Sequence, residues 1–244
     1  EKSWAFNCSC DRPLTLNELY EDVSLLAWHP WHSDDDLRNA DPFGPLNGPD
    51  VNEQNDFIEQ LLQDAGWEYT LVHSADDFAR EHRLGGYNSY LLLAERPQLH
   101  WQVQKELREA VFAGKGLIVA GGFDKRNLWL ESALGVAVIG RHPWARELQV
   151  HNSDLSSAWN AQLPLADKVQ GIWLTGAETL AEYALAGDDQ QHNWHWLDKG
   201  EHKAHDIFDV KRRAITGYDY GKGRSLFFGF DLLLQATQAG ADSS

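Results

Sequence analysis

Helix-sized and strand-sized segments alternate between residues 52 and 120, and this alternation constrains the fold more than any other feature of the chain. The strands are expected at 67–72, 87–94 and 117–120, and the helices at 52–65, 75–83 and 99–112. Strands that alternate with helices favour a parallel sheet, because parallel neighbours need a long crossover connection. Helices cover both faces of such a sheet. The sequence therefore predicts an α/β fold with a mainly parallel sheet.

Residues that favour helix ends delimit these segments. Ser74 precedes the helix expected at 75–83, and Asp77 follows three positions later, which is a typical N-terminal capping pattern. Gly66 and Gly114 stand just after two of the helices, where glycine accepts the left-handed conformation that ends a helix. The spacing of caps and stops therefore agrees with the apolar periodicity.

The rest of the chain is expected to belong to the same domain. Residues 23–28 form an apolar run and predict the first buried strand. Residues 29–50 are rich in Pro, Gly, Asn and Asp, which predicts a long loop. We predict one domain over residues 22–240, with an irregular lead-in at 1–21 and a His/Trp-rich insertion near 188–208.

The C-terminal part is predicted to add strands and a last helix. Two glycines flank Lys222 within 220–224, and this spacing predicts a β-hairpin turn, since the Gly-Lys-Ser context of a phosphate loop is missing. No element is assigned between about 140 and 168. The strands are expected at 169–174, 179–184, 213–220 and 225–230, and the helix at 232–239.

Charge and hydropathy exclude some classes of partner. The formal net charge is −16 at pH 7, because 37 acidic residues outnumber 21 basic ones. Such a charge disfavours a nucleic-acid backbone as a partner. No run approaches 18 apolar residues, so no membrane insertion is expected. From the acidic balance and a first residue other than methionine we expect an exported bacterial protein, periplasmic or extracellular, with the cytoplasm as the alternative.

A tight glycine turn follows the strand expected at 117–120. Residues 113–125 are interpreted as the end of a helix, a glycine stop, a short buried strand and this turn. In many α/β hydrolytic and amidotransfer domains, such a turn presents a nucleophilic Cys or Ser. Here it carries Gly121, Gly122 and Phe123, none of which supplies a nucleophile.

The order of four segments resembles a known superfamily. Residues 86–94 correspond to a strand whose carboxyl end reaches the site, and residues 111–122 correspond to a helix, a glycine turn and the elbow strand. Residues 178–183 and 220–231 correspond to the closing strands. Together they are similar to class I glutamine amidotransferase-like domains, and most of all to members without the catalytic Cys. Such members include trehalose-utilisation-type domains and the trimerisation domain of some β-galactosidases. The resemblance implies a flavodoxin-like three-layer αβα sandwich over roughly residues 23–238.

The departures from the family's pattern concern catalysis. Amidotransferases present Cys within Gly-x-Cys-x-Gly and pair it with a distal His and Glu. Here Gly121, Gly122, Phe123 and Asp124 occupy the elbow, and no cysteine follows Cys10. Without a nucleophile the chemistry of the family fails, so we expect a pseudo-active-site elbow with no catalytic residue. The crevice beside it is expected to be lined by Glu95, Lys125 and Arg126.

The start of the long loop suggests a different chemistry. His29, His32, Asp34 and Asp36 follow the first strand, where open α/β sheets place their ligand crevices. Imidazole and carboxylate groups together suit Zn, Mn or Fe, so these four residues are the hypothetical site of a divalent metal. Pro30 prevents a helical pair of histidines, and an acidic loop with two surface histidines is the alternative interpretation. No cofactor is firmly predicted.

A second cluster lies in the predicted insertion. Four histidines fall within 14 residues, at 192–205, around Trp194 and Trp196. Aromatic side chains of this kind can pack on sugar rings, so the cluster could form a carbohydrate-binding surface. The alternative is an exposed insertion whose tryptophans cap the sheet.

These features predict a non-catalytic amidotransferase-like binding or assembly module. Its partner is expected to be another protein, a small-molecule ligand or a second copy of the chain. A metal-dependent hydrolase that uses the loop at His29 and a carbohydrate-associated domain are the alternative hypotheses.

Overall fold

The computed structural model describes residues 23–29, 51–93, 99–121, 127–142, 145–150, 162–164, 169–185, 213–233 and 235. Within these residues the helices are α3 (Val51–Asp64), α4 (Ala75–Leu84), α5 (Trp101–Phe112) and α6 (Leu128–Leu134). The first four strands are β1 (Ser24–Trp28), β2 (Glu68–Val72), β3 (Ser89–Leu93) and β4 (Gly116–Ala120). The later strands are β5 (Val136–His142), β6 (Ala145–Val150), β7 (Gln162–Pro164), β8 (Val169–Leu174), β9 (Glu178–Leu185), β10 (Arg213–Tyr220) and β11 (Gly223–Phe228).

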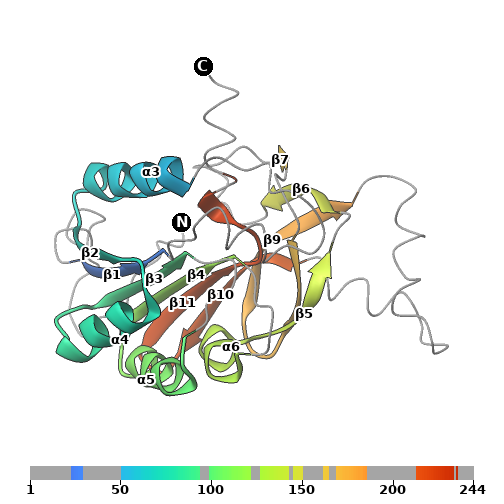
Figure 1. Ribbon diagram of the computed structural model, residues 1–244. Helices are drawn as coiled ribbons and strands as arrows, with labels where there is room; N and C mark the ends of the chain where they lie inside the picture. The colour runs from blue at the N-terminus through green and yellow to red at the C-terminus, as the bar shows by residue number, and fades with distance from the viewer. Residues whose placement is uncertain are drawn as a thin grey trace, which may run out of the picture.

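A nine-stranded sheet forms the centre of the molecule, in the order β2-β1-β3-β4-β11-β10-β9-β6-β7 (Figure 1). The five strands from β2 to β11 in this order run parallel to one another. The order reverses between β1 and β3, as it does in flavodoxin-like folds. The parallel α/β sheet expected from the sequence is therefore confirmed.

The other strands continue the sheet in a way that the sequence analysis did not predict. From β11 onward each strand pairs antiparallel with the next, through β10, β9, β6 and β7, and β5 pairs with β8 in a separate two-stranded sheet. No element had been assigned to β5, to β6 or to β7. In β6, Leu148 and Val150 are buried and alternate with polar Glu147 and Gln149, and β7 has three residues, so neither strand presents an apolar run long enough to show its period.

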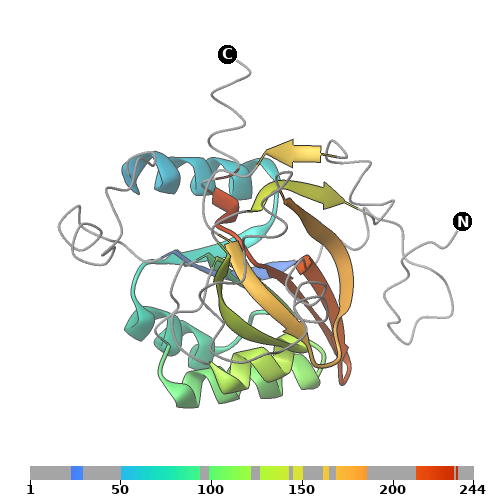
Figure 2. The ribbon, with the colours of Figure 1, turned by 90° about the vertical axis from the view of Figure 1, so that its right-hand side faces the viewer.

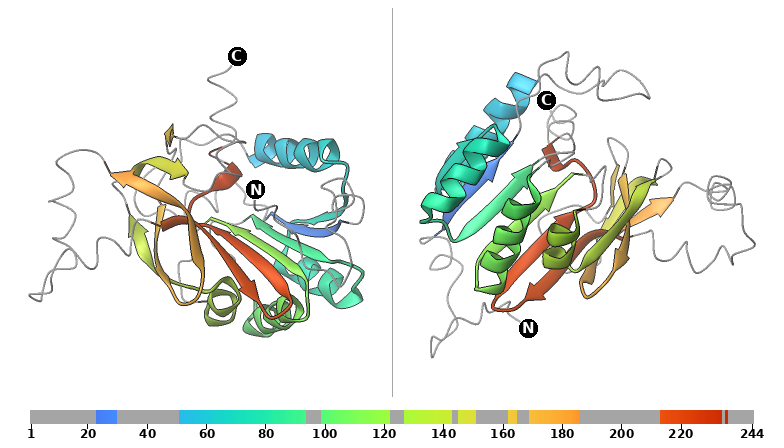
Figure 3. Two further views of the ribbon diagram at one scale, coloured as in Figure 1. Left: turned by 180° about the vertical axis from the view of Figure 1, so that it is seen from behind. Right: turned by 60° about the horizontal axis from the view of Figure 1, so that its bottom comes forward.

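Helices cover the two faces of the parallel strands (Figure 2). On one face, Phe78 of α4, Leu107 of α5 and Leu134 of α6 join one apolar core. These three helices lie side by side over the sheet in the right-hand view of Figure 3. On the other face, Ile58 and Leu62 of α3 join a second core. The three-layer αβα sandwich is thus confirmed.

Local interactions match the caps predicted from the sequence. The Ser74 hydroxyl accepts a hydrogen bond from the Asp77 N–H at 3.0 Å, at the start of α4. Gly66 and Gly114 follow α3 and α5 with positive φ angles of 68° and 123°. Both predictions followed from side-chain and backbone preferences that act within one turn of a helix, so tertiary packing did not need to be known.

The predicted hairpin turn joins β10 and β11. Tyr220 pairs with Gly223, which leaves Gly221 and Lys222 as a two-residue loop. Gly221 has a φ of 64°, and the Lys222 N–H donates to the carbonyl of Phe112 at 3.0 Å. A Cβ atom at Gly221 would overlap the same Phe112 carbonyl. The hairpin can therefore pack against the last turn of α5 only because glycine stands there.

Candidate functional site at the carboxyl edge of the parallel strands

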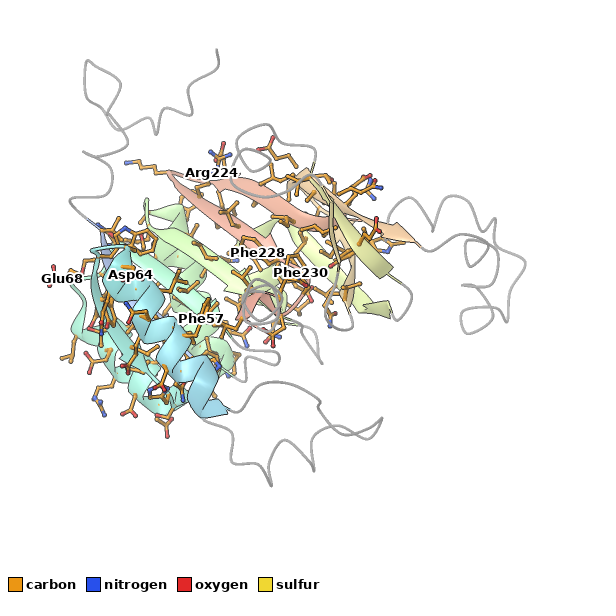
Figure 4. All side chains as sticks on the ribbon, turned by 90° about the horizontal axis from the view of Figure 1, so that it is seen from above. Phe57, Asp64, Glu68, Arg224, Phe228 and Phe230 are labelled. Atoms are coloured by element: carbon orange, nitrogen blue, oxygen red, sulfur yellow. The ribbon has the colours of Figure 1, made fainter. Side chains whose placement is uncertain are left out.

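The carboxyl ends of β1 and β3 are the expected place for a ligand, because the strand order reverses between them. The register pairs Trp28, the last residue of β1, with Val72 of β2 and Leu92 of β3, so the three strands end together. Figure 4 shows Arg224 and Phe228 at opposite ends of β11, with Phe230 beyond Phe228. Phe228 and Phe230 therefore mark the same carboxyl edge on the far side of β4.

His29 is buried at this edge directly after β1. Its side chain is 6% exposed, and its Nδ1 lies 2.7 Å from Oδ1 of Asn55, which is itself buried. An amide oxygen only accepts hydrogen bonds, so Nδ1 is the nitrogen that carries the proton. This hydrogen bond fixes the orientation of the ring, as a hydrogen bond to one ring nitrogen does for metal-binding histidines in general.

His73 occupies the equivalent position after β2. Its Nδ1 lies 2.9 Å from the backbone carbonyl oxygen of His29, so by the same reasoning Nδ1 donates this bond. Neither His73 nor Asn55 was among the site residues predicted from the sequence. His73 follows a predicted strand that neighbours β1 in a parallel sheet, which is a signal that could have found it. Asn55 carries no such signal, because its contact depends on how α3 packs over the sheet.

The glycine elbow begins at the end of β4. Gly121 is buried and has a φ of 107°, a conformation that favours glycine. Its N–H donates to the carbonyl oxygens of Phe228 at 3.2 Å and Phe230 at 2.9 Å. This amide is therefore used to join the elbow to the segment after β11. The next positions of the predicted elbow and crevice, Gly122, Phe123, Asp124, Lys125 and Arg126, lie outside the described residues.

A buried glutamine joins the two helices that flank the elbow. Nε2 of Gln104 in α5 donates to the carbonyl oxygen of Leu99 and to Oδ1 of Asn127, both at 2.8 Å. Asn127 is the N-cap residue of α6, and its side chain makes no capping hydrogen bond. Its oxygen is instead bonded to Gln104. Gln104 thus holds the starts of α5 and α6 together, and the sequence analysis did not single it out.

The structure describes few of the other predicted site residues. Of the hypothetical metal site, His29 is described, whereas His32, Asp34 and Asp36 lie outside the described part of the chain, as do Glu95, Trp194 and Trp196. Among the residues that the structure does describe, no group of three or more His, Cys, Asp or Glu is arranged to hold a metal ion. In the same part of the chain, no helix is both long and apolar enough to cross a membrane.

Comparison with known proteins gives structural but no sequence-level relatives. No protein-family model matches this sequence, and no curated protein matches it either. A solved β-galactosidase from Rahnella sp. R3 matches with a TM-score of 0.52 and 17% identity, over 91% of this chain and 31% of its own. The β-galactosidase of Halorubrum lacusprofundi matches with a TM-score of 0.53 and 16% identity, over 90% and 30%. A ThuA-like protein from Bacteroides uniformis matches with a TM-score of 0.53 and 11% identity, over 89% of each chain.

These likenesses establish the fold. The chain spans about a third of the β-galactosidases, at 31% and 30% of their length, but 89% of the ThuA-like protein. Both kinds of protein fit the resemblance that the sequence motifs indicated. Membership of the class I glutamine amidotransferase-like superfamily, and the domain bounds 22–240, stay predictions.

Proposed function

We propose that this chain is a non-catalytic binding or assembly module of an exported bacterial protein. The observation that carries the proposal is the elbow at the end of β4. The Gly121 N–H is bonded to two carbonyl oxygens of the segment after β11, and Gly122 and Phe123 follow where related enzymes place a nucleophile. An elbow of this composition keeps its role in the packing of the sheet and offers no Cys or Ser at the position of the family's nucleophile.

The fold comparisons support the same proposal. The matched fold occurs as part of much longer β-galactosidase chains and as most of a ThuA-like protein. The sequence motifs resemble the trimerisation domain of some β-galactosidases, so assembly with further copies is the role that we favour. The carboxyl edge at β1, β3 and β4 is the place that we assign to a small ligand or to a segment of a partner.

Sedimentation velocity over a range of protein concentrations tests the assembly role. We expect the purified chain to form one discrete homo-oligomer whose fraction rises with concentration, as mass action requires. Mass spectrometry under native conditions would show the number of subunits. A chain that sediments as a monomer at every concentration, without a bound ligand, would contradict the proposal.

A metal-dependent hydrolase is the second candidate, and the environment of His29 favours it. A buried imidazole whose Nδ1 donates to Asn55 is oriented as metal-binding histidines usually are. The other ligands would be His32, Asp34 and Asp36. Such a set combines imidazole with carboxylate, which suits Zn, Mn or Fe, and the metal would supply a bound water of lowered pKa.

Metal analysis of the purified protein separates the two candidates. If the chain is a metal-dependent hydrolase, the purified protein contains one equivalent of metal, which is lost in His29→Ala and in His32→Ala. The control is His100→Ala, at the exposed N-cap residue of α5, which should keep the metal. Thermal unfolding of each variant shows whether it is still folded, which matters because His29 is buried. Metal contents near zero in the unchanged protein would rule out the hydrolase, and a stoichiometric metal lost in both loop variants would overturn the non-catalytic module.

A further inference from the structure

A small hollow lies at the opposite edge of the sheet from the carboxyl ends of the parallel strands. Arg108, Glu109 and Phe112 of α5 and Tyr220 of β10 line it, and its volume is about 240 Å³. Tyr220 pairs with Gly223 at the start of β11, which places the hollow at the amino edge. It is therefore separate from the elbow, from His29 and from the crevice expected beside the elbow.

Packing holds the two aromatic walls in place. The rings of Phe112 and Tyr220 meet edge to face, with centroids 5.5 Å apart, and Tyr218 packs on Tyr220 at 5.8 Å. The hairpin beyond Tyr220 cannot move away from α5 without loss of the hydrogen bond from Lys222 to the Phe112 carbonyl. A Cβ atom at Gly223 would overlap the carbonyl oxygens of Val111 and Lys115, so this contact is close-packed.

The two charged residues that line the hollow, Arg108 and Glu109, each contact a neighbouring side chain. The guanidinium carbon of Arg108 lies 4.5 Å from the centre of the Trp129 ring, a cation–π contact that restricts the side chain. Glu109 lies next to it in sequence, and its Oε1 is 3.7 Å from Nζ of Lys105. The residues that line the hollow therefore include one basic, one acidic and two aromatic side chains. Phe112 is 59% exposed, so much of its ring is left for a ligand to cover.

This combination of groups selects a ligand with an apolar face and a polar edge. A pyranose ring has both, since its C–H groups pack on aromatic rings and its hydroxyls accept from a guanidinium and donate to a carboxylate. An anionic ligand is disfavoured by Glu109 and by the net charge of −16. The volume of about 240 Å³ is below the roughly 300 Å³ at which pockets for drug-sized ligands begin, so the hollow suits a ligand no larger than a single ring.

We propose that this hollow binds one neutral pyranose unit of an oligosaccharide. The proposal gives the carbohydrate-associated hypothesis a site among the described residues. It rests neither on the assembly role nor on the metal, so its failure would leave both unaffected.

Calorimetric titration with neutral saccharides tests the site. The probes are glucose, galactose, mannose and their β-1,4-linked disaccharides, added to the whole chain. We expect saturable binding of at least one of them, weakened 10-fold or more by Phe112→Ala and by Arg108→Ala. The matched control is Trp101→Ala, because Trp101 is 57% exposed on the same helix and does not line the hollow. Its binding should equal that of the unchanged protein.

Two further measurements make the outcome decisive. Tyr220→Phe keeps the aromatic wall and is expected to retain binding, and thermal unfolding of each variant confirms that it is folded. The proposal is overturned if no probe binds saturably, or if Trp101→Ala weakens binding as much as Phe112→Ala does. Tighter binding of glucose 6-phosphate than of glucose would also overturn it, since the hollow would then select anions.

Discussion

His82 of α4 lies between two aromatic rings. The ring of Phe78 is parallel to it within 3°, at 6.4 Å, and Tyr90 of β3 meets it at 65° and 5.2 Å. Its Nδ1 is buried and has no hydrogen-bond partner within the described residues. Burial lowers the pKa of His82, the nearby Glu106 carboxylate raises it, and the Arg83 and Lys115 cations lower it further. The aromatic environment thus favours the neutral imidazole.

This environment predicts a pH-dependent stability. Because the pKa of His82 is lower in the folded protein than in the unfolded chain, the unfolded chain binds the proton first as the pH falls below about 6.5. One such site lowers the free energy of unfolding by at most about 1.4 kcal/mol per pH unit. We expect His82→Phe to lose this dependence in urea unfolding at pH 7.5 and 5.5. His100→Ala, at an exposed histidine, should keep it, and equal slopes in all three proteins would refute the assignment.

Sequence reasoning found His29 but not Asn55 or His73. A residue that directly follows a predicted strand can be placed at the edge of a sheet, which locates His29 from the sequence alone. The contact with Asn55 depends on the rotation of α3 about its own axis, and the contact from His73 depends on which strand lies beside β1. Both are properties of tertiary packing, which local residue patterns do not encode.

At the scale of elements, the parallel half of the sheet was predictable and the antiparallel half was not. Strands β1 to β4 alternate with amphipathic helices, and glycines mark the hairpin between β10 and β11. Among the described elements, strand β6 follows β5 and precedes β7 with no helix between them, and its alternate residues Glu147 and Gln149 are polar. Its position is determined by pairing with β9, which lies about 30 residues later in the chain.

The two hydrogen bonds by which Gln104 joins the starts of α5 and α6 can be tested by substitution. Gln104→Ala removes the two hydrogen bonds that its side-chain amide donates, one to the buried Leu99 carbonyl and one to the Asn127 side chain. We expect a loss of about 1–3 kcal/mol in the free energy of unfolding, because each of the two lost hydrogen bonds contributes about 0.5–1.5 kcal/mol. Gln102→Ala, at an exposed position of the same helix, is the control and should change little. Equal losses in both variants would show that helix propensity, and not these hydrogen bonds, sets the effect.

The molecule as a whole combines a large covered sheet with a strongly acidic composition. Helices α4, α5 and α6 cover one face of the parallel strands, and α3 covers part of the other (Figure 1). A net charge of −16 acts between any two copies of the chain, whichever surfaces meet. Assembly therefore has to overcome a repulsion that is long-ranged at low salt.

This repulsion gives the assembly proposal a salt dependence of known sign. Raising the ionic strength from 0.1 M to 1 M shortens the Debye length from about 10 Å to about 3 Å, which screens charges on two approaching copies. We expect the homo-oligomer to dissociate less at 1 M salt, with a several-fold lower dissociation constant by sedimentation velocity. Sodium and potassium chloride should act alike, because screening depends on ionic strength and not on the cation. Weaker assembly at 1 M salt would mean that ion pairs hold the interface together, and the acidic surface would then face a basic one.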